Sequence, residues 1–240
     1  PRDRVRFLLE LIRIELDKVA AGSQVQVFDP YLKKNPDNLA LAIAVGSAYV
    51  RDGQAEEGVK VLKEARDRHP DSADAWDALL MGLDEGFQAD ALKSELAKLP
   101  PSMADDPRFA KHIGAVAQND RDWPKAVAAL RRAYEFEPYN GAVLYRLRMA
   151  LRSAEDTEEF ERIDQKLTAQ QEAVKKLRSV YEEARGVRTL GVEKHTELCH
   201  KIAAIREQMG RYDEAAAWHR LVLQDTPDDP VSLAAVARLK

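Results

Sequence analysis

The phrases LKKNPDN (residues 32–38) and RDRHPDS (residues 66–72) each contain one proline, Pro36 and Pro70, and these two positions define a period of 34 along the chain. Pro138, within FEPYN (136–140), falls two further periods after Pro70. Pro227, within QDTPDD (224–229), departs from this phase, so the pattern requires one insertion before it. A fixed period of this length is the signature of a repeat architecture, in which each repeat is one supersecondary unit.

Nearly every segment between these prolines is rich in Ala, Leu, Glu, Lys and Arg, and no stretch alternates apolar and polar residues as a strand does. The pattern therefore predicts pairs of antiparallel helices. Within a pair, helices approach closely where small residues face each other, which is the role expected of Gly46 with Gly58 and of Gly114 with Ala126. The predicted units are residues 5–38, 39–72, 73–106, 107–140, 141–174 and 196–229.

Three of these units carry a recurring set of residues at equivalent places. Unit 39–72 has Val45, Gly46, Tyr49, Gly58, Leu62, Ala65 and Pro70; unit 107–140 has Ile113, Gly114, Ala117, Ala126, Leu130, Ala133 and Pro138; unit 196–229 has Ile202, Ala203, Arg206, Ala215, His219, Val222 and Pro227. This set resembles the consensus of the tetratricopeptide repeat (TPR). The resemblance implies an all-α fold, a right-handed α-solenoid of TPR helix-turn-helix repeats, and it indicates a bacterial TPR domain. An unrelated helical bundle whose prolines coincide by chance is the alternative fold.

The other units depart from the set. Pro30 predicts a kinked or short second helix in unit 5–38, and Pro100-Pro101 predicts that the second helix of unit 73–106 stops at Leu99 before a loop. In unit 141–174, Arg148 and Phe160 stand where small residues normally meet, so this pair is expected to splay or slide.

An extended helix is expected from about residue 157 to 185, because no proline interrupts it and apolar residues recur in a heptad-like series: Ile163, Leu167, Val174, Leu177, Tyr181 and Ala184. The chain thus divides into a TPR array at 1–174, a long helix and turn inserted at 157–195, and a C-terminal TPR unit with a capping helix at 196–240. The long helix either packs along its own repeats or forms a coiled-coil dimer, so the chain is predicted to be a monomer or a weak homodimer. Residues 230–240 either cap the array or begin a further repeat.

Composition narrows the classes of function. With 45% hydrophobic and 32% charged residues the chain can form a core, and a net charge of -4 argues against a nucleic-acid partner. No apolar run is long enough for a membrane span, so no membrane partner is predicted. The single cysteine, Cys199, excludes an internal disulfide. Because the sequence begins with Pro1 and ends at Lys240 inside a helical pattern, we expect a piece of a longer protein. The compartment stays open, with the cytoplasm favoured over export.

No phosphate-binding loop, HExxH, GxSxG or Cys-x-x-Cys pattern is present, so the sequence predicts neither catalytic residues nor a cofactor. In KHTELCH (194–200), His195 and Cys199 lie four residues apart on one helix face, as two metal ligands would. His200 is expected to face the groove, and His219 is the one obvious further ligand. Core packing explains Cys199 better, and no metal is predicted.

The resemblance to TPR proteins implies that a concave groove, formed mainly by the first helix of each repeat, binds a peptide. Its residues here would be Asp74, Asp77 and Met81 in one repeat, with Arg108, Lys111, Asn119, Tyr145, Arg146, Met149 and Arg152 in the next two. An acidic sector thus lies beside a basic one, and either these charges are simply solvated or Lys111, Arg146 and Arg152 hold the acidic groups of a peptide. We therefore expect a non-enzymatic scaffold or adaptor for a protein or peptide. The alternatives are an accessory segment of a larger enzymatic or exported protein, and a self-assembly module built on the long helix.

Overall fold

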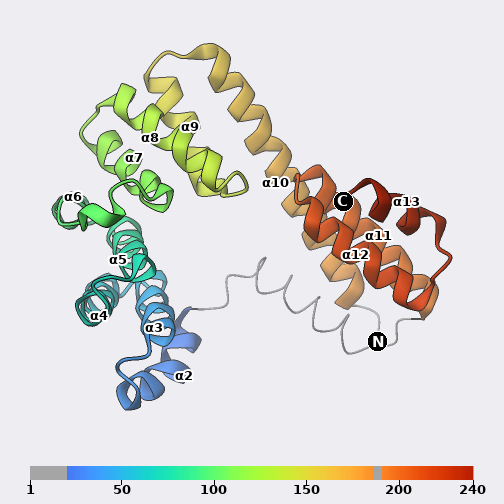
Figure 1. Ribbon diagram of the computed structural model, residues 1–240, viewed down its shortest axis with the longest axis horizontal. Coiled ribbons are helices and arrows are strands. Elements are labelled where there is room, and N and C mark those ends of the chain that lie inside the picture. The colour runs from blue at the N-terminus through green and yellow to red at the C-terminus, as the bar shows by residue number, and fades with distance from the viewer. Residues whose placement is uncertain (1–20, 186–190, 240) are drawn as a thin grey trace. The chain divides into compact units, whose positions relative to one another are not determined.

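The computed structural model describes residues 21–185 and 191–239, and in these residues the chain is entirely helical (Figure 1). The first predicted helix, before residue 21, lies outside this range. The described chain forms two compact units, which we call the N-terminal unit (residues 21–163) and the C-terminal unit (residues 164–185 and 191–239). No helix of the described part is both long enough and apolar enough to cross a membrane.

The N-terminal unit consists of consecutive helical hairpins. Its helices are α2 (Ala21–Lys34), α3 (Leu39–Arg51), α4 (Ala55–Arg68), α5 (Ala73–Glu85), α6 (Ala89–Leu96), α7 (Ala110–Asn119), α8 (Trp123–Phe136) and α9 (Gly141–Ser153). Side-chain caps at Asn38, Ser72 and Asn140 begin α3, α5 and α9, each accepting a backbone N–H of the first turn. These caps lie within or directly after the phrases that carry the repeated prolines.

The period of 34 reappears in the backbone of the turns between paired helices. Gly53, Phe87, Arg121 and Glu155 all have a positive φ, and each follows the one before it by a single period. Gly210 has the same backbone conformation, and its position is displaced from this series by the same insertion that displaces Pro227. One left-handed residue thus closes each described hairpin from α3 onward, and the repeat phase deduced from the prolines is confirmed.

The close helix crossing in the hairpin of α3 and α4 depends on glycine. A Cβ atom on Gly58 would lie 2.6 Å from the backbone oxygen of Gly46 and 2.8 Å from the backbone nitrogen of Val50. These neighbours are backbone atoms, so they cannot rotate away as a side chain could. In the hairpin of α9 and α10 (Thr157–Arg185), where larger residues hold these places, the guanidinium of Arg148 instead lies 5.6 Å from the ring centroid of Phe160.

Two local expectations need adjustment. The helix α2 contains Pro30 and continues to Lys34, so it is not short, and the kink at Pro30 stays a prediction. The helix α6 ends at Leu96 rather than Leu99, and the segment after it contains two short 3-10 helices, η1 (Pro101–Met103) and η2 (Pro107–Phe109). Phe109 and Met103 are buried with Leu92, so this segment contributes to the core of the N-terminal unit.

The C-terminal unit contains most of the long helix α10 (Thr157–Arg185), together with α11 (Val192–Gln208), α12 (Tyr212–Asp225) and α13 (Pro230–Arg238). The bounds of α10 agree with the predicted range of about 157 to 185. Leu177, Tyr181 and Ala184 of the heptad-like series are buried in one core with Leu198, Ile202 and Trp218 of α11 and α12. This half of the series packs along the chain's own helices and is not available as a dimer seam.

Candidate functional site

The first helices of the N-terminal unit form the surface on which the predicted groove residues lie. Consecutive first helices contact each other (α3 with α5, α5 with α7 and α7 with α9), whereas the second helices α4, α6 and α8 contact each other less. Helices that lie closer together are on the inner side of a curved stack, so the first helices line the concave side of this unit. We call the solvent-facing side of α3, α5, α7 and α9 the first-helix wall.

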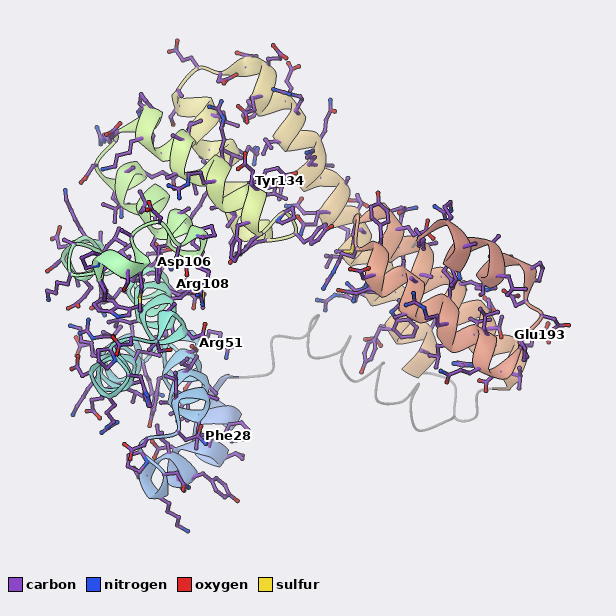
Figure 2. The ribbon with its side chains drawn as sticks, in the orientation of Figure 1. Phe28, Arg51, Asp106, Arg108, Tyr134 and Glu193 are labelled. Atoms are coloured by element: carbon purple, nitrogen blue, oxygen red, sulfur yellow. The ribbon has the colours of Figure 1, made fainter. Side chains whose placement is uncertain are left out.

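One end of the wall is an ion-pair network centred on Arg108. Its guanidinium contacts Asp74 of α5 at 2.7 Å. It also contacts Asp106 at 2.7 Å, and both Arg108 and Asp106 are labelled in Figure 2. Asp106 also caps the start of η2 by accepting the backbone N–H of Arg108, and the hydrogen bonds from Arg108 lower the pKa of Asp106. Asp74 and Arg108 are one period apart and occupy equivalent places in adjacent repeats.

The centre of the wall is organised by the carboxylate of Asp77. Its Oδ1 lies 2.7 Å from Nε2 of His112 and 3.1 Å from Nζ of Lys111, and Lys111 also contacts Glu137 at 3.2 Å. Burial by itself raises the pKa of Asp77, but the hydrogen bond with His112 and the charges of His112 and Lys111 outweigh it, so the pKa is lowered. His112 is only 2% exposed, so it supports Asp77 from beneath the surface.

A third connection spans two repeats. The guanidinium of Arg146, on α9, contacts both carboxylate oxygens of Asp84, on α5, at 2.7 and 2.8 Å. Gln118 of α7 lies between them, donating to the backbone oxygen of Arg146 at 3.0 Å and accepting from its guanidinium at 3.3 Å. The first helices of three consecutive repeats are therefore joined by one polar network.

The remaining predicted residues keep their side chains open to solvent. Tyr145 is 51% exposed and Met81 is 36% exposed, while Met149 is half-buried and Asn119 is exposed. Arg152 is exposed and forms no ion pair within the described part of the chain. The wall thus offers apolar contact area and an unpaired cation, whereas Arg108, Lys111 and Arg146 are already neutralised by carboxylates of the same unit.

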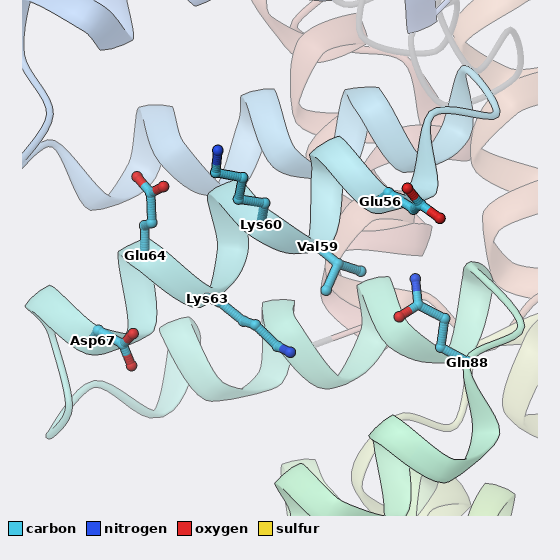
Figure 3. Close-up of a pocket in the computed structure, with 7 residues that line it drawn as sticks. All are labelled: Glu56, Val59, Lys60, Lys63, Glu64, Asp67 and Gln88. Carbon is cyan, nitrogen blue, oxygen red and sulfur yellow. The ribbon is translucent and has the colours of Figure 1, made fainter.

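A surface hollow of about 300 Å³ lies elsewhere, on the second helix α4 beside the start of α6 (Figure 3). Val59 is its one apolar residue, and the others are charged or polar: Glu56, Lys60, Lys63, Glu64, Asp67 and Gln88. Small-molecule sites are mostly apolar with a few convergent polar groups. The residues that line this hollow are instead mostly charged, with both signs present, so they provide few apolar side chains for a ligand.

The histidine and cysteine residues considered as metal ligands lie in the C-terminal unit. Nε2 of His195 is 3.3 Å from Sγ of Cys199, and its Nδ1 is 3.0 Å from Asp225. Burial, with the nearby charge of Asp225, raises the pKa of the Cys199 thiol to about 12, which removes its reactivity at neutral pH. Among the residues that the structure describes, no group of three His, Cys, Asp or Glu side chains is arranged to hold a metal ion.

Ser232, His200 and Asp229 are also close together, but their geometry differs from that of a hydrolase triad. The same nitrogen of His200, Nε2, faces both the Ser232 hydroxyl and the Asp229 carboxylate, each at 3.0 Å. A triad needs the acid on the opposite ring nitrogen, and its serine must reach a substrate. Ser232 is completely buried, so this cluster is structural.

Comparisons with known proteins agree with these repeats. Residues 39–81 match the family model described as Tetratricopeptide repeat. The chain is 29% identical over 157 residues to the Cellulose synthase operon protein C of Pseudomonas fluorescens (strain SBW25), an alignment that covers 60% of this chain but only 12% of that protein.

Two solved structures, both 16% identical to this chain, cover 98% of it. The "Structure of Naa15/Naa10 bound to HypK-THB" has a TM-score of 0.39, with 39% of that chain covered. The "Crystal Structure of P58(IPK) TPR Domain" has a TM-score of 0.29, with 64% of that chain covered.

Proposed function

Since this chain carries tetratricopeptide repeats, which form protein-interaction scaffolds, we propose that it binds a protein or peptide along the first-helix wall of its N-terminal unit. The observation that carries this proposal is the composition of the wall. Exposed Met81 and Tyr145 lie beside an ordered set of ion pairs that fixes the first helices of three repeats relative to one another. A rigid surface with exposed apolar anchors binds with a smaller loss of conformational entropy.

The partner that fits this wall is an extended or helical segment with apolar side chains and acidic groups. Tyr145 and Met81 supply contact area, Met149 extends it, and Arg152 is the cation free to take a carboxylate. Asn119 can donate from its amide. Lys111 and Arg146 bind an acidic group only by exchanging Asp77 or Asp84 for it, so they set specificity for a partner with a matching charge pattern.

The test is capture of partners from a lysate of the source organism by the full chain and by variants of the wall. Tyr145→Ala with Arg152→Glu removes one exposed anchor and reverses the unpaired charge, and partner recovery is expected to fall at least tenfold, or about 1.4 kcal/mol. Lys125→Glu is the matched control, since Lys125 is exposed on the second helix α8 and its side chain forms no ion pair in the described structure. If the wall variant retains the same partners as the control, the wall is not the binding surface.

A second proposal follows from the length of the relative. The chain spans 12% of the Cellulose synthase operon protein C, which favours the accessory interpretation, a repeat segment that serves a larger protein. The binding surface would then position that protein's other parts or its partners. Crosslinking mass spectrometry on the full-length gene product distinguishes the two proposals: crosslinks from the first-helix wall to another domain of the same polypeptide favour the accessory role, and crosslinks to a separate protein favour the adaptor.

A further inference from the structure

The last helix of the described chain, α13, packs on α12, and one buried hydroxyl links it to both α11 and α12. Oγ of Ser232 lies 3.0 Å from Nε2 of His200, on α11, and 3.1 Å from Nδ1 of His219, on α12. Ser232 is completely buried and His219 is 4% exposed. Asp229 caps α13 by accepting the backbone N–H of Ser232 at 2.7 Å and also faces Nε2 of His200 at 3.0 Å. These contacts involve none of the residues of the first-helix wall.

The hydrogens in this cluster can be counted. The arrangement that satisfies every group has Nε2 of His200 donating to Ser232 and Asp229, while the Ser232 hydroxyl donates to Nδ1 of a neutral His219. When His219 gains a proton, its Nδ1 becomes a donor. Ser232 then receives hydrogens from both rings, and its own hydrogen loses its ring acceptor at a site without solvent exposure.

The charges around His219 come from α11 and α13. Glu207 of α11 lies 3.6 Å from Nε2 of His219, and its other carboxylate oxygen is held by Arg238 of α13 at 2.7 Å. The ring of His200 is 5.7 Å away, centroid to centroid, and Asp229 adds a more distant negative charge. Burial, then the charge of His200, lower the pKa of His219, and together they outweigh the opposite effects of Glu207 and Asp229.

We propose that α13 is a pH-gated cap, which stays on α11 and α12 while His219 is neutral and is released when His219 is protonated. The sign follows from linkage: a histidine whose pKa is lower in the docked state contributes stability that is complete above its ordinary value, about 6.5, and is lost as the pH falls below it. Release uncovers the surface of α12 on which α13 packs, together with His200 and His219, which Ser232 now contacts.

The test is hydrogen exchange of the full chain, followed by mass spectrometry at pH 7.5 and pH 5.5 and corrected for the intrinsic effect of pH on exchange. Peptides covering 230–239 are expected to exchange several-fold faster at pH 5.5, while peptides from α3 and α4 keep their protection. His219→Gln retains a side-chain amide that can accept from Ser232 but cannot be protonated, so its α13 is expected to show the same protection at both pH values. His69→Gln, at a half-buried histidine of the N-terminal unit, is the control that leaves the response of α13 unchanged.

The outcome is decisive even if H219Q folds poorly, which circular dichroism would show. The ring resonances of His219 in the natural chain then give its titration directly, and the midpoint of α13 release should coincide with it. Equal protection of α13 at both pH values, a response that persists in a folded H219Q, or a His219 titration that does not coincide with α13 release would overturn the proposal.

Discussion

The two units of the chain share their helix packing but differ in where they place polar groups. The N-terminal unit puts carboxylate–cation pairs such as Asp84–Arg146 on the partly exposed first-helix wall, with His112 buried beneath it, whereas the C-terminal unit buries His195 against Asp225 and His219 against Ser232. The first arrangement leaves apolar core packing between helices undisturbed. The second places imidazoles in the helix interfaces, and burial lowers the pKa of one of them, His219, so different titrating groups set the stability of the two units.

The largest effect is expected from Leu177→Ala, which removes a side chain of α10 that is 1% exposed in the core of the C-terminal unit. Large-to-small changes in a core cost about 2–5 kcal/mol, and we expect about 3 kcal/mol here. Urea unfolding measures the loss. Labelling of Cys199 locates it, because this buried thiol reacts only when its unit opens.

Val174→Ala is the matched control, on an earlier turn of the same helix, where the side chain is 37% exposed. It should cost less than about 1 kcal/mol and leave Cys199 protected. An equal cost for both variants would show that the buried side of α10 is not the one described.

The corresponding change in the N-terminal unit is Gly58→Ala. The new methyl group would meet backbone atoms of Gly46 and Val50, so the hairpin of α3 and α4 must separate, at a cost of about 2 kcal/mol even though alanine favours helices. Gly191→Ala, where a Cβ meets no atom within 4 Å, should change stability by less than about 0.5 kcal/mol. Urea unfolding measures both, and hydrogen exchange should show faster opening of α3 and α4 in G58A but protected amides in α11 and α12. Faster exchange in α11 and α12 would mean that the units do not open separately.

Acid should affect the units in a fixed order. In the N-terminal unit, burial raises the pKa of Glu95, but hydrogen bonds from Lys98 and Arg66 outweigh it and lower the pKa, as those of His112 and Lys111 do for Asp77. A carboxylate with a lowered pKa contributes stability that is complete above its ordinary value of about 4 and is lost only as the pH falls further. His219 begins to withdraw its contribution below about pH 6.5.

Hydrogen exchange between pH 7.5 and 3 therefore should show α13 losing protection first and the N-terminal unit last. The reverse order, or simultaneous loss, would contradict this assignment of the groups that set acid stability in each unit.

The sequence predicts the repeat phase well because the phase is set by prolines and small residues at fixed spacings along the chain. Pro70, its spacing from Pro36 and the small residues at 46 and 58 require no knowledge of the three-dimensional structure. The bounds of α10 follow for the same reason, since no proline interrupts it and an apolar series runs along it. The end of α6 at Leu96 is harder to predict from the sequence, because the burial of Phe109 and Met103 in the segment that follows depends on tertiary packing.

The contacts among the predicted groove residues could be deduced from the sequence only in part. Asp74 and Asp77 each lie one period before a cation, Arg108 and Lys111, and equivalent places in adjacent first helices are neighbours in space. That spacing could have predicted the ion pairs, whereas the sequence interpretation considered only that these charges are solvated or that they bind a ligand. The pair of Asp84 with Arg146 spans two repeats, and it depends on the curvature of the stack, which no local spacing encodes.

The smallest effect, of opposite sign, is expected at a type of hairpin turn that occurs in both units. Phe87 in the N-terminal unit and Gly210 in the C-terminal unit both have a positive φ, of 57° and 76°. A left-handed conformation costs a residue with a Cβ about 1–2 kcal/mol, and Phe87 recovers none of this by burial because it is 95% exposed. Phe87→Gly removes the strain but adds conformational entropy to the unfolded chain, so a net stabilisation of about 0.5 kcal/mol is expected.

Gly210→Ala introduces the same strain in the other unit and should cost about 1 kcal/mol. Urea unfolding of the two variants gives both values, and destabilisation by F87G would show that the exposed ring makes a contact in solution that offsets its backbone strain. The recovery of partners by F87G provides a second measurement. If F87G folds, is more stable and loses partners, part of the binding surface lies at this turn. If it keeps its partners, the first-helix wall stays the proposed binding surface of the N-terminal unit.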